Sequence, residues 1–404
     1  FTEVAAEIEK ESPVGNWVLM DGSGEDTAFE RIMTTAEPIY EMIDLSPDDL
    51  AMIMYSSGTT GRPKGVTLNH ENMLFGGVFN GLSVMGMRSE AVGYSVLPLF
   101  HIGGTNGFST STLYSGGTTI LDRSFDPGRA LEVIGDKELG VTHFLGVPAM
   151  YNAMKAHPAS ATTDFSGLDI AMAGAEAVPE PMVRWWLEER GLLVQEVYGM
   201  TETCGGTAFL VKADMPDKIG SSGKALRHTQ FKIVDPETLE EVPVGAVGEI
   251  WMRGPNIMPG YWNRPEANAE TLVDGWLRSG DVGRIDAEGF VYVEDRVKDM
   301  YISGGENVYP AEVESVLYGI DAIGEVAVIG VPDSQWGEVG CAVVALKDGA
   351  ELTITDLCRH CEGKLAHYKQ PVHMAVVEAL PRNATGKVLK FQLRKSVPET
   401  LELR

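Results

Sequence analysis

Short apolar runs alternate with segments of helical periodicity between about residue 51 and residue 198. The runs are apolar almost throughout, which is typical of strands that crossover helices cover on both faces. Six strands are expected, at Ala51 to Tyr55, Val92 to Leu97, Thr118 to Leu121, Val141 to Leu145, Leu168 to Met172 and Leu193 to Val197. The pattern therefore predicts an α/β fold whose large domain is built on a doubly wound, mostly parallel sheet.

The sequence changes character after Glu202. Antiparallel strands joined by turns are expected at Phe231 to Val234, Val247 to Met252, Val282 to Ile285 and Gly289 to Glu294, and they predict a β-rich subdomain. A smaller α+β unit is expected beyond Asp295, with helices from Pro310 and Thr353 and strands at Val326 to Ile329, Ala342 to Leu346 and His373 to Val377. We therefore expect a large domain over residues 1–294 and a small domain over residues 295–404.

The composition is that of an ordinary globular protein, with 44% hydrophobic and 22% charged residues. Lys and Arg number 32 against 58 Asp and Glu, and the net charge of −26 argues against a sequence-independent grip on nucleic acid or anionic lipid. Four cysteines in 404 residues are too few for a disulfide framework, which favours a reducing compartment and hence the cytoplasm. No apolar stretch approaches the roughly 20 residues that span a bilayer, so no transmembrane segment is expected.

A loop rich in glycine and hydroxyl groups follows the first expected strand. It reads Tyr55-Ser56-Ser57-Gly58-Thr59-Thr60-Gly61-Arg62-Pro63-Lys64-Gly65. The glycines let the backbone approach an anion, the hydroxyls can donate to phosphate oxygens, and Lys64 supplies a positive charge. It is not the P-loop pattern, because Lys64 is preceded by Pro63 and followed by Gly65. The loop predicts a triphosphate cradle, with a flexible surface turn as the structural alternative.

Five further motifs follow the loop in order: Tyr198 to Thr203, Gly275 to Asp281, Asp295 to Asp299, Ser303 to Asn307 and Pro381 to Lys387. Together with the loop they resemble the adenylate-forming superfamily, which holds acyl-CoA synthetases, aryl-CoA ligases, peptide-synthetase adenylation domains and luciferases. The likeness is tightest to bacterial fatty-acyl-CoA synthetases, over Asp295 to Glu314 and Tyr198 to Gly206. Superfamily members usually carry a substantial segment before the loop, and 54 residues precede Tyr55 here. We therefore expect the first domain to lack its usual beginning.

The resemblance implies an acid–thiol ligase. A carboxylate is activated by MgATP to an acyl-adenylate with release of pyrophosphate, and the thiol of coenzyme A then displaces AMP. The expected cofactors are ATP or AMP, Mg²⁺ and coenzyme A, and the expected partner is a small carboxylic acid. A homodimer is a further expectation for the assembly. A fatty acid is the expected substrate. The alternatives are an aryl acid such as a hydroxycinnamate or a benzoate, or a fragment that binds adenylate without turnover.

The same resemblance assigns roles to individual residues. The β- and γ-phosphates are expected on Ser56, Ser57, Gly58, Thr59, Thr60, Gly61 and Lys64. The expected catalytic residues are Thr201, which would donate to a phosphate, Glu202, whose hard oxygen suits Mg²⁺, Lys387, beside the α-phosphate and the substrate carboxylate, and His101. Tyr198 is expected to stack on adenine, and Asp281 is expected to accept hydrogen bonds from the ribose hydroxyls. The full set of other nucleotide contacts is Gly174, Ala175, Glu176, Tyr198, Gly199, Met200, Asp281 and Arg296. Taken alone, Glu202 could begin a helix and Asp281 could lie in a turn. Because both stand in motifs that occur in the order of the superfamily, the functional interpretation is favoured.

Asp295 lies where the two expected domains meet, and the resemblance implies that it acts as a hinge. The small domain is expected to present Lys387 for adenylation and then to rotate. After rotation, a pantetheine tunnel is expected to be lined in part by Lys298, Ser303, Gly304, Gly305 and Glu306.

His101 follows the strand expected from Val92, in a stretch that borders the acyl site in the resembling proteins. A neutral imidazole there would gate the pocket or contact the carboxylate, while a His that merely ends a strand is the alternative. Residues 97–114 contain no Asp or Glu, which disfavours amino-acid-activating relatives, because those need an acidic group for the substrate ammonium. An apolar acid is therefore expected, with room for a chain or a ring at Gly103, Gly104 and Gly107.

Overall fold

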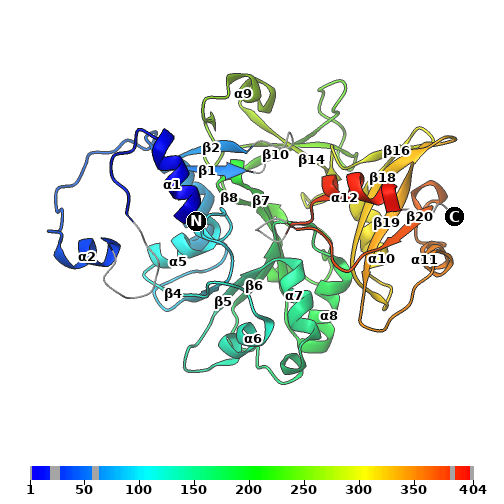
Figure 1. Ribbon diagram of the computed structural model, residues 1–404, viewed down its shortest axis with the longest axis horizontal. Helices are drawn as coiled ribbons and strands as arrows, with labels where there is room; N and C mark the ends of the chain where they lie inside the picture. The colour runs from blue at the N-terminus through cyan, green and yellow to red at the C-terminus, as the bar shows by residue number, and fades with distance from the viewer. Residues whose placement is uncertain (1, 19–27, 57–62, 383–386, 401–404) are drawn as a thin grey trace. The chain divides into compact units, whose positions relative to one another are not determined.

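The computed structural model describes residues 2–18, 28–56, 63–382 and 387–400 (Figure 1). The chain divides into two compact units, Phe1–Ser46 and Pro47–Arg404. The described part of the first unit holds helices α1 (Thr2–Glu11) and α2 (Ala28–Thr35). Among the described residues, the four sheets and the largest set of cavity-lining side chains belong to the second unit. The expected division near Asp295 stays a prediction.

The largest sheet has seven strands in the order β4, β3, β5, β6, β7, β8, β9. Their bounds are β3 (Val92–Ser95), β4 (Thr118–Leu121), β5 (His143–Gly146), β6 (Ile170–Gly174), β7 (Val194–Met200), β8 (Gly205–Phe209) and β9 (Lys224–Ala225). Strands β4, β3, β5, β6 and β7 run parallel, and β8 and β9 join antiparallel at one edge. The five parallel strands lie where the apolar runs predicted them, so the mostly parallel sheet is confirmed.

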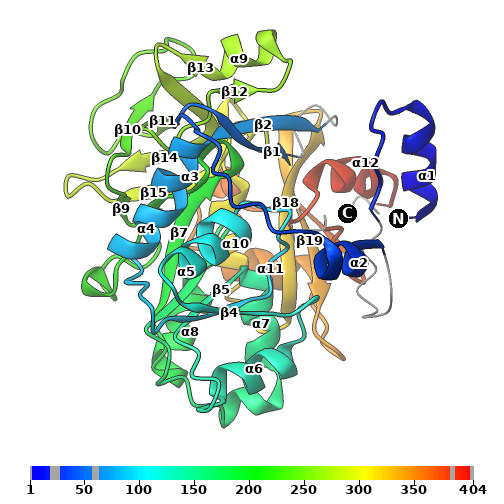
Figure 2. The same cartoon turned by 90° about the vertical axis from the view of Figure 1, so that its left-hand side faces the viewer.

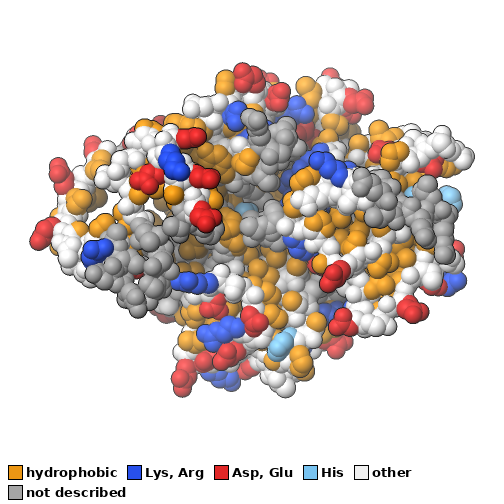
Figure 3. All heavy atoms as spheres, in the orientation of Figure 1, with side chains coloured by type: hydrophobic (Ala, Val, Ile, Leu, Met, Phe, Trp, Pro, Cys, Tyr) orange, Lys and Arg blue, Asp and Glu red, His pale blue; other side chains and the backbone are white. Residues whose placement is uncertain are grey.

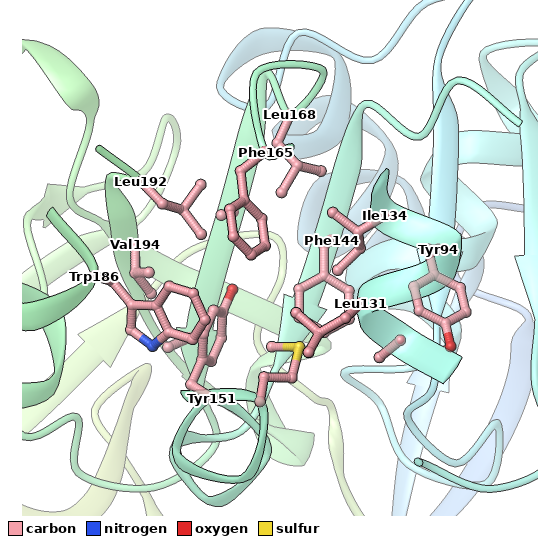
Figure 4. Packing of buried hydrophobic residues seen from close by; sticks show 14 of the residues in the cluster. Tyr94, Leu131, Ile134, Phe144, Tyr151, Phe165, Leu168, Trp186, Leu192 and Val194 are labelled. Carbon is pink, nitrogen blue, oxygen red and sulfur yellow. The ribbon is translucent and has the colours of Figure 1, made fainter. Parts of the chain in front are cut away.

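Both faces of this sheet are covered. On one face pack α6 (Pro127–Gly135), α7 (Pro148–Ala156), η3 (Pro158–Ala161) and α8 (Glu180–Arg190). Their core, shown in Figure 4, contains Phe144, Tyr151 and Trp186, and the rings of Tyr151 and Trp186 meet edge to face with centroids 5.9 Å apart. The other apolar cluster of the sheet gathers Leu97, Phe108 and other buried residues. Phe108 belongs to η2 (Thr105–Ser109), which packs with η1 (Leu74–Val78) and α5 (Thr110–Tyr114), and η1 in turn contacts α3 (His70–Met73) and α4 (Phe79–Ser83). Figure 2 shows α3 and α4 in succession with α5 beside them.

The first expected strand is present, but its assignment to the parallel sheet is wrong. Strand β1 (Leu50–Ser56) pairs antiparallel with β2 (Lys64–Asn69), which pairs with β12 (Gly260–Tyr261) in a separate three-stranded sheet. The loop between β1 and β2 is too short for a parallel crossover, which needs roughly a dozen residues or more. The hairpin therefore holds the ends of the predicted phosphate loop together, although residues 57–62 lie outside the described part of the chain.

The expected β-rich subdomain is an antiparallel five-stranded sheet. Its strands are β10 (Gln230–Val234), β11 (Gly248–Arg253), β13 (Leu272–Val273), β14 (Trp276–Ile285) and β15 (Val291–Arg296), with α9 (Pro265–Thr271) just before β13. The short helical turns η4 (Thr201–Thr203) and η5 (Lys212–Asp214) belong to the seven-stranded sheet, where they connect β7 to β8 and β8 to β9. The turn between β14 and β15 closes as predicted, because the Gly289 N–H donates to the Asp286 carbonyl at 3.0 Å.

A second five-stranded sheet, hereafter the C-terminal sheet, follows β15. It comprises β16 (Tyr301–Ser303), β17 (Glu306–Val308), β18 (Ile323–Asp333), β19 (Gly337–Leu346) and β20 (His373–Val376), packed with α10 (Pro310–Leu317), α11 (Ile354–Cys361), η6 (His367–Lys369) and α12 (Lys390–Thr400). The two predicted helix starts are confirmed: Pro310 is the first residue of α10, and the Thr353 hydroxyl caps α11 by accepting from the Asp356 N–H at 3.2 Å.

Acidic side chains are spread over the surface in Figure 3 rather than gathered into one patch. On this face the negative charge therefore marks no binding site of its own. Among the described residues, none of the helices combines the length and the apolar character that a bilayer span requires.

Candidate active site

A cavity of about 790 Å³ opens at the carboxyl ends of β5, β6 and β7. Open parallel sheets place their ligands at this edge. Strands β14 and β15 and the described residue Lys387 complete the wall. The predicted site residues that line the cavity are Ser56, Lys64, His101, Gly174, Ala175, Glu176, Gly199, Met200, Thr201, Glu202, Arg296, Lys298 and Lys387.

The other predicted site residues fall into three groups. Tyr198 donates a hydrogen bond to Asp281, and Asp281 forms an ion pair with the lining residue Arg296. Ser303, Gly304, Gly305 and Glu306 form the β16–β17 hairpin and do not line the cavity. The phosphate-loop residues outside the described part of the chain are Ser57, Gly58, Thr59, Thr60 and Gly61.

The cavity has two chemically different ends. The charged end is lined by Lys64, Glu202, Arg296 and Lys387, among others. The apolar end is lined by Asn80 together with Val84, Met85, Leu97, Leu145, Val147, Met172, Val197, Phe209 and Leu226. These nine apolar residues belong to a single packed cluster. Such a cavity suits a ligand with a charged portion and an apolar portion.

Glu202 occupies the 3₁₀ turn that follows β7 and is 7% exposed. Its Oε1 accepts from the Tyr261 hydroxyl at 2.9 Å and from the Ser56 hydroxyl at 3.3 Å. Within the described chain its Oε2 accepts no hydrogen bond, and the residue lines the cavity. One free carboxylate oxygen beside a phosphate site is the arrangement that Mg²⁺ uses, because this ion takes one or two protein carboxylates and completes its shell with phosphate oxygens and waters.

Tyr261 was missed by sequence reasoning. Besides its bond to Glu202, its ring lies 4.8 Å from the Lys64 ammonium, so it links the lysine of the phosphate loop to the candidate Mg²⁺ ligand. Its position follows from the pairing of β12 with β2, which joins segments far apart in the chain. The local sequence around Tyr261 carries no comparable signal.

Asp281 is held between two predicted partners. Strand register places it opposite Arg296, whose Nε lies 3.1 Å from the Asp281 Oδ1, and the Tyr198 hydroxyl donates to Oδ2 at 2.7 Å. Burial and the neighbouring Asp281 carboxylate raise the pKa of Tyr198, so the phenol stays protonated and keeps donating. Asp281 is 4% exposed, and each of its oxygens retains a second acceptor site. The predicted roles in holding ribose and adenine stay predictions.

Lys387 and His101 both line the cavity and lie close enough for the charge of one to act on the other. Burial, together with the positive charges of the nearby Arg296 and Lys298, lowers the pKa of Lys387 to about 8. Burial also lowers the pKa of His101, with a second contribution from the charge of Lys387. The Gly103 N–H donates to the His101 Nδ1 at 3.1 Å, which places the proton of the neutral ring on Nε2. The imidazole therefore offers one N–H donor to a ligand.

We expect adenylation to lose activity as the pH rises through about 8, because the Lys387 ammonium is charged below its lowered pKa and neutral above it. The loss is measured as kcat/KM for acid-dependent exchange of pyrophosphate into ATP, determined as a function of pH. Lys387→Arg carries a guanidinium that stays charged, so its profile should hold to higher pH whatever its absolute rate. The same alkaline fall in both proteins would assign the titration to another group.

Two contacts tie the wall of the cavity to the C-terminal sheet. Arg382 precedes Lys387 by five residues, and its Nη1 lies 3.7 Å from the Glu176 Oε2 while its Nη2 lies 2.6 Å from the Glu325 Oε1. Asp295, at the end of β15, accepts from the Ala311 N–H in the first turn of α10 at 2.7 Å. Both contacts favour the orientation that brings Lys387 to the cavity. Arg382 was missed as a site residue, although it stands within the quoted motif.

Two glycines of the cavity wall mark close backbone approaches. A Cβ at Gly76 would lie 2.6 Å from the Cys204 carbonyl oxygen, and a Cβ at Gly199 would collide with the Gly205 carbonyl oxygen. Strand β7, strand β8 and η1 therefore pack backbone against backbone at this place.

Comparison with known proteins decides the family. A family model described as AMP-binding enzyme matches residues 3–262, and a second, described as AMP-binding enzyme C-terminal domain, matches residues 312–387. The chain belongs to the AMP-binding enzyme family. The predicted membership of the adenylate-forming superfamily is thereby confirmed, as is the fold.

Three relatives of this AMP-binding enzyme illustrate its neighbourhood. A feruloyl-CoA synthase from Amycolatopsis sp is 44% identical over 348 residues, covering 86% of this chain and 70% of the relative. The long-chain-fatty-acid–CoA ligase FadD13 of Mycobacterium tuberculosis is 35% identical over 403 residues, covering 98% of this chain and 76% of the relative. The structure of o-succinylbenzoate coenzyme A synthetase from Bacillus subtilis, in complex with ATP and magnesium ion, aligns with a TM-score of 0.80 at 33% identity, covering 98% of this chain and 82% of that one.

These findings confirm the expected reaction type. The AMP-binding enzyme is an acid–thiol ligase that forms acyl-CoA and uses ATP, Mg²⁺ and coenzyme A. The relatives differ in the acid that their names record.

Proposed function

We propose that this AMP-binding enzyme activates an apolar carboxylic acid as its acyl-adenylate and transfers the acyl group to coenzyme A. The observation that carries the proposal is the cavity with one charged and one apolar end, in which the lining residues of the apolar end bear no charge. A carboxylate at the meeting point of the two ends would reach the nucleotide, and its apolar body would be buried away from water.

In the first half-reaction a carboxylate oxygen attacks the α-phosphorus of ATP, and the bond to pyrophosphate breaks. Lys387 offsets the negative charge shared by the carboxylate and the α-phosphate, and the Nε2–H of His101 donates to the acid. Lys64 and Thr201 hold the departing phosphates at the charged end. Bound Mg²⁺ supplies charge neutralisation of the phosphates, and Glu202 would hold it through its unbonded oxygen.

In the second half-reaction the thiol sulfur of coenzyme A attacks the acyl carbon, the acyl–phosphate bond breaks, and AMP leaves with the electron pair. Lys387 fills part of the wall in the orientation seen here, so we propose that the domains comprise residues 1–294 and 295–404 and that the second rotates about Asp295. Lys298 and residues Ser303 to Glu306 would then approach the pantetheine arm.

Asp295→Pro is expected to lower thioester formation at least about tenfold more than adenylation, because proline fixes φ at the proposed hinge. The two half-reactions are measured separately, by pyrophosphate exchange and by single-turnover thioester formation from preformed acyl-adenylate. Asp295→Asn is the matched control, because it keeps the backbone free and can still accept from the Ala311 N–H. Equal losses in both half-reactions of Asp295→Pro would remove the hinge assignment.

The acid itself is tested with a panel. Fatty acids of graded length, expected from the sequence, and aryl acids such as cinnamate and benzoate all meet the requirement for an apolar body, and the relatives named above include both kinds. Thioester formation with MgATP and coenzyme A ranks these acids by kcat/KM. AMP binding without pyrophosphate release for any acid would instead favour the expected alternative of an adenylate-binding fragment.

A further inference from the structure

Asn80 is a buried polar residue at the apolar end of the cavity. It lies in α4, is 3% exposed and lines the cavity. Its Nδ2 is committed to the backbone, donating to the Gly206 carbonyl at 3.3 Å and to the Gly76 carbonyl at 3.4 Å. Because both partners are acceptors, the amide cannot be turned over without losing them, and the orientation of the side chain is fixed.

The opposite end of this amide is its Oδ1 oxygen. Throughout the described residues no group donates to the Asn80 Oδ1. Val84 follows one helical turn later, and its N–H donates to the Asn80 carbonyl at 2.9 Å, so the two side chains share a face of the helix. Val84 packs in the same apolar cluster as Leu97 and Met172. The Oδ1 is therefore a hydrogen-bond acceptor presented within an otherwise apolar part of the wall.

We propose that the Asn80 Oδ1 selects acids that carry a hydrogen-bond donor far from the carboxylate. An acid without a donor would displace water from this oxygen and leave it without a hydrogen bond. A hydroxyl at the matching position replaces the hydrogen bond of the displaced water. The hydroxyl could belong to the ring of an aryl acid or to the far end of an aliphatic chain, and both present the same O–H to the same acceptor. This inference rests on the proposed function, because it names the class of acid that the apolar end takes.

The test compares acids that differ in the donor and little in shape. The first pair is para-hydroxycinnamate and para-methylcinnamate, and the second is ω-hydroxydecanoate and undecanoate. One of the two pairs is expected to fit the cavity. Within that pair, the wild-type enzyme should form the thioester of the hydroxylated acid with a kcat/KM about ten- to a hundredfold higher than that of the methyl-bearing acid. The pair with the larger kcat/KM shows whether the hydroxyl is carried by an aryl ring or by an aliphatic chain.

Two variants assign the preference to Asn80. Asn80→Leu keeps the branched arrangement of heavy atoms and has no acceptor, so the preference of this variant for the hydroxylated acid should fall to near unity. Met85→Leu changes a neighbouring lining residue without changing polarity, and should leave the ratio as in the wild type.

The outcomes separate the two proposals. Turnover of both members of each pair at equal kcat/KM in the wild type would overturn the role of Asn80 and leave the proposed function standing. A preference that persists in Asn80→Leu would also overturn it. Failure of every acid, hydroxylated or not, would overturn the proposed function and this inference with it. If Asn80→Leu fails to fold, the wild-type ratios still decide.

Discussion

Lys387→Ala is expected to slow adenylation by about a hundred- to a thousandfold, the usual loss when one preorganised charge is removed from a reacting phosphate. The side chain reaches the cavity between Arg296 and His101, where burial makes a single positive charge effective and lowers its pKa to about 8. Exchange of pyrophosphate into ATP measures the loss directly. Thioester formation from preformed acyl-adenylate should change by less than about threefold, because Lys387 acts in the first half-reaction alone.

A surface lysine provides the matched control for this variant. Lys395 lies on α12, near the ring of Phe391, away from the cavity lining. Lys395→Ala removes the same charge from the same part of the chain and should leave both half-reactions near the wild-type rate. Losses of similar size in the two half-reactions of Lys387→Ala would show that this residue shapes the fold and not the adenylation chemistry.

Glu202→Gln is expected to lower adenylation by about a hundredfold and to raise the Mg²⁺ concentration needed for half-maximal rate. The amide oxygen can still accept from the Tyr261 hydroxyl, so the local structure is kept while the negative charge is lost. The rate of pyrophosphate exchange is followed as Mg²⁺ is titrated at fixed ATP.

Tyr261→Phe separates the charge of Glu202 from its positioning. It removes the hydroxyl that donates to Oε1 at 2.9 Å and leaves the carboxylate in place. We expect a loss of roughly tenfold with a nearly unchanged Mg²⁺ requirement. If Glu202→Gln leaves the Mg²⁺ titration where it was, Glu202 does not hold the ion.

The sequence carried enough local information for the parallel sheet and for much of the cavity wall. Apolar runs such as the one from Val92 predict strands because burial on both faces leaves no polar positions. Residues such as Glu202 and Lys387 stand in ordered motifs, and the structure brings both to the same cavity. These features follow from short segments of chain, which is why they could be predicted.

The features that were not predicted depend on pairing between distant segments. Strand β1 has the apolar character of a parallel strand, but its hairpin to β2 places it in another sheet. Tyr261 reaches Glu202 through the pairing of β12 with β2, and Asn80 reaches the cavity because α4 lies beside Gly206 of β8. A local pattern specifies that a strand or helix forms, whereas its partner is decided by packing over the whole chain.

The close backbone contacts at Gly76 and Gly199 bear on how this site could change during evolution or in the laboratory. Any larger residue at Gly76 must displace the Cys204 backbone, since its Cβ would lie 2.6 Å from that carbonyl oxygen, and Gly199 faces the same obstacle at Gly205. These parts of the wall are therefore closed to substitution. New acid preferences are expected to arise through side chains such as Asn80 and Val84, so a library that seeks other acids should vary those positions and leave the glycines untouched.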